Sequence, residues 1–164
     1  DETVLAEAGF AVTPPPRYLA TGAGPEGTIA RFGRVSFSGT DGVQSLTVVR
    51  DAEADIATSS GGAALETYAR EQAEQAVPRD AADFAFESLV VEDEGRIARG
   101  ATTFVQHGER KQNVWYWRVD QRGGVVCAAI AASQCVPRDE LRADLDGAMS
   151  SLRLVTGRGE QPGE

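Results

Sequence analysis

The chain has 164 residues, of which 25 are acidic and 16 basic, giving a formal net charge of −9. This length is typical of one domain and suffices to bury a hydrophobic core without disulfides or a metal. Nucleic-acid-binding proteins usually present a basic surface that neutralises phosphates, so the acidic balance argues against a nucleic-acid partner. The sequence contains no apolar run of about 18 residues, and it therefore predicts no transmembrane segment.

The two ends of the chain are polar. We expect an N-terminal tail over residues 1–8, a single domain over 9–155 and a disordered C-terminal tail over 156–164. Because the sequence starts at Asp1 without an initiator Met, we expect the natural N-terminus to have been removed. A signal peptide or a lipid anchor upstream of Asp1 would fit such a start.

The first third of the chain is rich in β-forming residues. Three prolines at 14–16 exclude helix and favour an extended segment at a sheet edge, and glycines between 22 and 27 indicate a loop. Strands are predicted over 28–39 and 43–53. The Thr-Asp-Gly at 40–42 joins them as a hairpin.

A helix is predicted over 63–77. Ser59 or Ser60 can cap its start, and Pro78 prevents its continuation. Its apolar residues recur at helical spacing: Leu65, Tyr68, Ala69, Ala73 and Ala76.

Four further strands follow. They are predicted over 84–93, 96–107, 113–120 and 125–133. The segments between them are short and rich in turn-forming residues, which indicates an antiparallel meander. These breaks lie at 94–95, 108–112 and 121–124.

A last helix begins near Pro137, with Asp139 and Glu140 placed favourably at its N-terminal dipole. Its apolar face comprises Leu141, Leu145, Ala148, Met149 and Leu152. The order of elements predicts an α+β fold with a mainly antiparallel sheet of six to seven strands.

The stretch at residues 113–135, NVWYWRVDQRGGVVCAAIAASQC, indicates how the faces of that sheet are covered. Alternate side chains of a strand point to opposite faces, yet both faces of 113–120 and of 125–133 are apolar. Loss of apolar-polar alternation indicates strands covered on both sides, and their small Ala side chains suit the close approach of a helix. The charged end differs: Tyr116, Arg118 and Asp120 are the candidate binding residues, at a groove where helix coverage runs out.

The two cysteines, Cys127 and Cys135, are separated by seven residues. This spacing matches neither a redox pair nor a zinc ligand pair, and the single His107 lies too far away in sequence to complete a zinc site. A disulfide needs Cα atoms about 5.5 Å apart, so a bridge requires the strand to end or bulge near Ile130. Two free thiols are favoured, and a disulfide stays the alternative.

No residue set forms a catalytic signature. Asp51, Glu53 and Asp55 alternate as in a calcium loop, but Ile56 and Gly62 stand where an EF-hand needs Gly and Glu, so a solvated loop is favoured. There is no nucleophile elbow and no phosphate-binding loop. We expect no enzyme activity, no catalytic or metal-ligating residues and no cofactor.

Several motifs resemble the PsbP-like superfamily, in particular its DcrB-like branch of small bacterial exported or secretion-linked proteins. They are FAVTPPPRY (10–18), SLTVVRD (45–51), GRIARGATTF (95–104), YWRVDQRGGVV (116–126) and AMSSLRLV (148–155). The resemblance implies an antiparallel sheet with helices on both faces, which is an α/β/α sandwich. Its members include photosystem accessory subunits, lipoproteins, a Ran-binding transport factor and chaperones for type VI secretion effectors.

The residues and the resemblance together favour two functions. The first is a non-catalytic accessory or binding protein of the bacterial periplasm or cell surface, in one form a lipoprotein, with a protein partner. The alternative is a cytoplasmic chaperone that shields a hydrophobic segment of a secretion-system effector, which needs an exposed apolar groove. An enzyme is the third reading, and a deep pocket with convergent polar groups would favour it.

Overall fold

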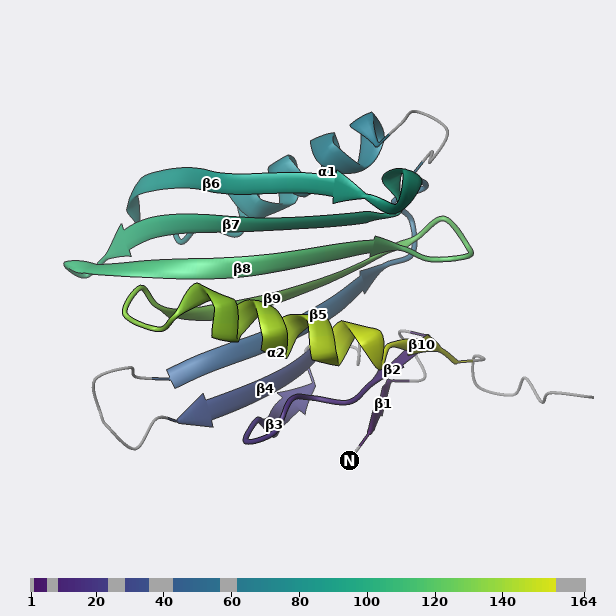
Figure 1. Cartoon of the computed structure of the whole chain (residues 1–164), viewed down its shortest axis with the longest axis horizontal. Coiled ribbons are helices and arrows are strands. Elements are labelled where there is room, and N and C mark those ends of the chain that lie inside the picture. Colours follow the sequence, from purple (N-terminus) through teal and green to yellow (C-terminus); the bar gives the residue numbers. More distant parts are fainter. Residues whose placement is uncertain (1, 6–8, 24–28, 36–42, 57–61, 156–164) are drawn as a thin grey trace, which may run out of the picture.

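A large antiparallel sheet organises the chain (Figure 1). The structure is a computed structural model that describes residues 2–5, 9–23, 29–35, 43–56 and 62–155. Within these residues the sheet has seven strands, and all its neighbours are antiparallel. In spatial order they are β3 (Leu19–Ala23), β4 (Ile29–Val35), β5 (Val43–Asp51), β9 (Val125–Ser133), β8 (Glu109–Val119), β7 (Ile97–Gln106) and β6 (Ala82–Glu92).

A helix covers each face of this sheet. Helix α1 (Ala63–Gln75) contacts β6 and β7 on one face, and α2 (Arg138–Ser150) contacts β8 and β9 on the other. The predicted fold class, an α+β sandwich with a mainly antiparallel sheet, is therefore confirmed. Neither helix of the described part of the chain is long and apolar enough to cross a membrane.

A small second sheet joins the two ends of the domain. It consists of β1 (Thr3–Leu5), β2 (Phe10–Val12) and β10 (Arg153–Leu154), with β2 in the middle. All three residues of β2 are buried. Strand β1 lies inside the segment 1–8 that was predicted to be a tail, because β2 offers it an edge on which its backbone can pair.

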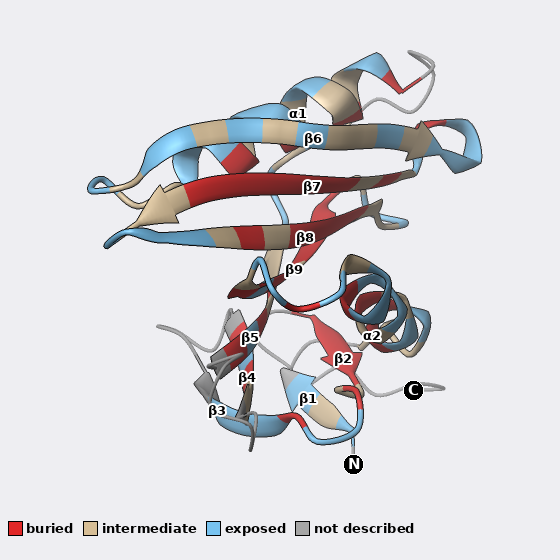
Figure 2. Ribbon diagram, turned by 60° about the vertical axis from the view of Figure 1, so that its left-hand side comes forward, coloured by how far each residue is buried: buried red, intermediate tan, exposed pale blue. Residues whose placement is uncertain are grey.

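The central strands separate two hydrophobic cores, and Figure 2 shows the buried residues concentrated along β7, β8 and β9. The alternation predicted for 113–120 and 125–133 is confirmed, since neighbouring side chains enter opposite cores. The core under α2 includes Val114, Tyr116, Val126, Ala128, Ile130, Leu141, Leu145 and Met149. The core under α1 includes Leu65, Ala69, Ala73, Trp115, Trp117, Val125 and Cys127.

The turn between β7 and β8 corrects one prediction. Segment 108–112 was predicted to be a break, but β8 already begins at Glu109. The turn consists of His107 and Gly108 alone, with φ of 53° and 76°. Two positive φ values match the twist of a two-residue hairpin, so the polar residues that follow are free to pair in the strand.

Other boundaries shift by smaller amounts. Strand β3 runs into the predicted glycine loop, β6 starts two residues before 84, and α1 ends two residues before 77. The N-cap position of α1 is occupied by Gly62. The predicted turn at 40–42, the predicted caps Ser59 and Ser60, and the tail 156–164 lie outside the described residues.

Both cysteines are free thiols. Strand β9 continues to Ser133, so Cys127 is buried in the sheet while Cys135 lies exposed in the following turn. This is the outcome that the strand geometry favoured. Burial raises the pKa of the Cys127 thiol.

Candidate functional site

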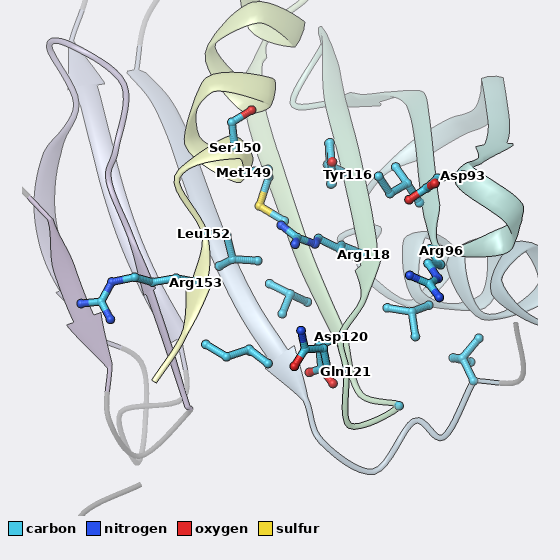
Figure 3. A pocket seen from close by; sticks show the side chains of 16 residues that line it. Asp93, Arg96, Tyr116, Arg118, Asp120, Gln121, Met149, Ser150, Leu152 and Arg153 are labelled. Atoms are coloured by element: carbon cyan, nitrogen blue, oxygen red, sulfur yellow. The ribbon is translucent and has the colours of Figure 1, made fainter. Parts of the chain in front are cut away.

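A cleft of about 1070 Å³ lies on the α2 face of the sheet, beside the point where α2 ends (Figure 3). Its lining comes from β7, β8 and β9, from the end of α2 with the following segment, and from the turns on either side. All three residues predicted from the sequence, Tyr116, Arg118 and Asp120, line this cleft. The structure thus brings them together beside the open end of the helix, and their role in binding stays a prediction.

The end of α2 creates the opening. The helix stops at Ser150, and the Leu152 amide donates to the Met149 carbonyl as the chain turns toward β10. Tyr116 lies below the helix and is 7% exposed, whereas Arg118, two residues further along β8, is only half-buried. Helix coverage therefore ends between these two residues.

Asp120 is held firmly inside the protein. Its Oδ2 accepts a hydrogen bond from Arg50 Nε at 2.8 Å, and the two side chains are 5% and 9% exposed. Its Oδ1 accepts hydrogen bonds from the backbone amides of Arg122, at 2.8 Å, and Gly124, at 3.1 Å. Both carboxylate oxygens are thus engaged, so Asp120 shapes the turn between β8 and β9 and the wall of the cleft.

Tyr116 is also committed to packing. The guanidinium of Arg99 lies 4.9 Å from its ring centroid, a favourable cation–π distance. Arg99 itself bonds Glu92 through Nη1, at 2.6 and 2.7 Å, and Asp146 of α2 through Nε at 3.2 Å. Burial raises the pKa of the Tyr116 phenol, and the charges of Arg99 and Arg118 oppose that rise.

Arg118 differs from both. Its register partners are Ile97 on β7 and Val126 on β9, so apolar side chains flank it on the cleft floor. Figure 3 shows its side chain extending from β8 in the direction of Met149. Within the described residues Arg118 makes no ion pair and no side-chain hydrogen bond.

Sequence reasoning missed the other side of the cleft. Arg96 lines it from the turn that follows β6, and Met149, Leu152 and Arg153 line it from the end of α2 and the segment after it. Arg153 bonds Glu2 at 2.7 and 2.9 Å. Leu152 and Met149 carried a sequence signal, because both belong to the predicted apolar helix face. Arg96 carried none.

This chemistry suits binding by charge and apolar contact. The lining combines arginines with the apolar residues Ile97, Val126, Met149 and Leu152. In the part of the chain that the structure describes, no group of three or more His, Cys, Asp and Glu side chains is arranged to hold a metal ion.

Comparisons with known proteins identify the fold. No protein-family model matches the chain, and no curated protein matches it. The solved structure of the Saccharomyces cerevisiae Ran-binding protein Mog1p is 12% identical, with a TM-score of 0.61 over 95% of each chain. Cyanobacterial PsbP from Synechocystis is 11% identical, with a TM-score of 0.51 over 94% of this chain and 91% of that chain.

A third similar structure is PA94 from Pseudomonas aeruginosa, described as a protein of unknown function. It is 17% identical, with a TM-score of 0.50 over 72% of this chain and 78% of that chain. At these identities the likeness shows the fold alone. The fold implied by the PsbP-like resemblance is thereby supported, and the DcrB-like branch stays a prediction.

Proposed function

We propose that the chain is a non-catalytic binding protein that holds a segment of a protein partner in the cleft beside the end of α2. The observation that carries this proposal is the cleft itself. Its floor holds Arg118, which makes no ion pair with any described residue, between the apolar residues Ile97 and Val126. Mog1p, which shares the fold, is a Ran-binding protein, and this supports a protein as the partner. Fold alone does not transfer a function.

For the location we propose the bacterial periplasm or cell surface, in one form with a lipid anchor upstream of Asp1. The resemblance to the DcrB-like branch supports this choice.

The second candidate is a cytoplasmic chaperone for a secretion-system effector. The apolar part of the lining favours it, since Ile97, Val126, Met149 and Leu152 offer a surface on which a hydrophobic segment can pack.

Site-specific photocross-linking tests the proposal. A photoreactive p-benzoylphenylalanine is placed at Gln121, an exposed residue of the cleft lining, in the bacterium that encodes the chain. The matched control is the same replacement at Gln134, which is exposed after β9 at the opposite end of the sheet. We expect a discrete protein adduct from position 121 and none from position 134.

Adducts from both positions, or from neither, would refute the proposal. Fractionation of the cells before illumination separates the two locations. An adduct in the periplasmic or envelope fraction supports the first candidate, and an adduct with an effector in the cytoplasmic fraction supports the chaperone.

A further inference from the structure

We infer that the cleft recognises a carboxylate on the partner segment, and that Arg118 is the residue that binds it. The inference rests on the proposed function, because it names the chemistry of the segment that the same cleft would hold.

Three carboxylates on this face, those of Asp120, Glu92 and Asp146, are each bound by another arginine. Asp120 lies two residues further along the chain, just after the end of β8, and its Oδ2 is bound by Arg50. Glu92 and Asp146 both bind Arg99. Arg118 is therefore a half-buried cation that makes no ion pair with any residue the structure describes.

The charged side chains that line the cleft also leave an excess of positive charge. Arg153 is paired with Glu2, and Asp120 with Arg50. Among the described residues, the lining side chains that carry a charge and make no ion pair are then Arg96, Arg118 and Asp93, and Asp93 is exposed at the rim. An excess of positive charge in one cleft of a chain with net charge −9 is a local feature that a negative group can use.

The overall negative charge does not prevent this. At physiological salt the Debye length is about 8 Å, so distant acidic residues are largely screened, whereas a contact with Arg118 is not. A guanidinium matches the geometry of a carboxylate, with two parallel N–H donors facing its two oxygens.

The apolar floor favours a peptide over a small inorganic anion. Ile97 and Val126 flank Arg118 directly, and Met149 lies at the wall. A volume of about 1070 Å³ is far larger than a phosphate ion requires. Gln121 and Ser150 add polar groups to the lining, which suits a peptide backbone better than an acyl chain. The occupant is thus a peptide with an acidic residue between apolar side chains.

Two matched peptides test the inference on the full chain. The first is Ac-Gly-Leu-Asp-Leu-Gly-NH₂, and the second has Asn in place of Asp, with the same shape and no charge. Binding is followed by two-dimensional ¹⁵N NMR, including the Nε–H signal of Arg118. We expect the acidic peptide to shift the Arg118 signal and the cleft amides, with at least tenfold higher affinity than the Asn peptide.

Variants assign the effect to one residue. Arg118→Gln should lower the affinity for the acidic peptide about tenfold. Arg110→Gln is the matched control, since residue 110 lies on the same strand and the same face, at the far end of β8. It should change the affinity less than twofold. The thermal midpoints of both variants show whether each remains folded.

Three outcomes would overturn the inference. The peptides could bind equally, Arg118→Gln could leave the affinity unchanged, or neither peptide could shift the cleft while phosphatidylglycerol vesicles do, which would assign the cleft to a lipid. In the first two cases the Gln121 cross-link to a protein would persist, so partner binding would stand while carboxylate recognition failed. Loss of the cross-link would instead refute the proposed function.

Discussion

Replacing Asp120 by Asn should destabilise the protein, although the sequence singles this residue out for binding. The substitution keeps the shape of the side chain and an oxygen that can still accept the amides of Arg122 and Gly124. It removes the negative charge at the atom that accepts Arg50 Nε at 2.8 Å. If the oxygen keeps the two amides, an NH₂ group then faces the guanidinium, and two donors cannot bond each other.

The size of the loss follows from the burial of the pair. Because the two side chains are 9% and 5% exposed, solvent screens their interaction weakly. A hydrogen bond to a charged group contributes about 1.5–3 kcal/mol, so Asp120→Asn should lower the free energy of unfolding by about 2–3 kcal/mol. For a domain of this length that corresponds to a thermal midpoint about 4–12 °C lower. Asp120→Ala also removes the acceptor for the two amides and should cost about 1 kcal/mol more.

Urea denaturation followed by circular dichroism measures this loss, and a double-mutant cycle with Arg50→Gln isolates the pair. We expect a coupling energy of about 1.5–3 kcal/mol between residues 50 and 120. Arg118→Gln is the control, and its stability should stay within about 0.5 kcal/mol of the parent because Arg118 makes no ion pair with the residues that the structure describes. A coupling energy near zero, or equal losses in the Asp120 and Arg118 variants, would refute the assignment of a structural role to Asp120.

Three further predictions concern glycines, thiols and pH. Gly100→Ala should lower the free energy of unfolding by about 1–3 kcal/mol in urea denaturation, because the added Cβ would lie 2.8 Å from the Ser88 carbonyl oxygen. Gly147→Ala in α2 should raise the free energy of unfolding by about 0.5–1 kcal/mol, because no neighbouring atom lies within 4 Å of the added Cβ. Titration with dithionitrobenzoate should label one thiol, Cys135, in the native protein and both after unfolding, and rapid native labelling of Cys127 would contradict its burial. Burial raises the pKa of Cys127 in the folded state, so the contribution of this thiol to stability is complete below its unfolded pKa of about 8.5 and falls by up to about 1.4 kcal/mol per pH unit above it. In Cys127→Ala, the free energy of unfolding in urea should therefore depend less steeply on pH between about pH 8.5 and 10. An unchanged slope would exclude Cys127 as the cause of the pH dependence.

The sequence predicted best where a short period governs the structure. In the stretches 113–120 and 125–133, the two-residue period of a strand assigned each side chain to a face, and Trp115, Trp117 and Cys127 do lie in a different core from Val114 and Tyr116. Strands β1 and β10 have three and two residues, too few to show a period. They form because β2 offers them its edges, and that is a tertiary effect.

The cleft was predictable only on one side. Tyr116, Arg118 and Asp120 stood out because polar residues interrupt an apolar strand. The residue that binds Asp120 lies 70 positions earlier, and only the neighbouring order of β5, β9 and β8 brings it close. Without that order the sequence cannot distinguish an aspartate that binds a ligand from one that is already paired.

Asp120→Asn should also change peptide binding, and the direction of that change distinguishes a structural role of Asp120 from a direct role in binding. Arg50 and Arg118 both pair in register with Val126, so they flank it in one row across β5, β9 and β8. Asp120 follows the end of β8 and lies about 7 Å along the chain from Arg118, at about 3.3 Å per residue of extended backbone. A ligand carboxylate on Arg118 would be repelled by Asp120 by roughly 0.5 kcal/mol in water, before salt screening. In low-salt buffer, removing that charge should therefore raise the affinity for the acidic peptide by up to about twofold, while Arg118→Gln lowers it. If Asp120 contacted the partner directly, Asp120→Asn would weaken the binding of cationic groups of the partner and would not raise the affinity for the acidic peptide. The sign of the change in affinity, measured by NMR titration well below the thermal midpoint, therefore decides whether Asp120 is a wall residue or a binding residue.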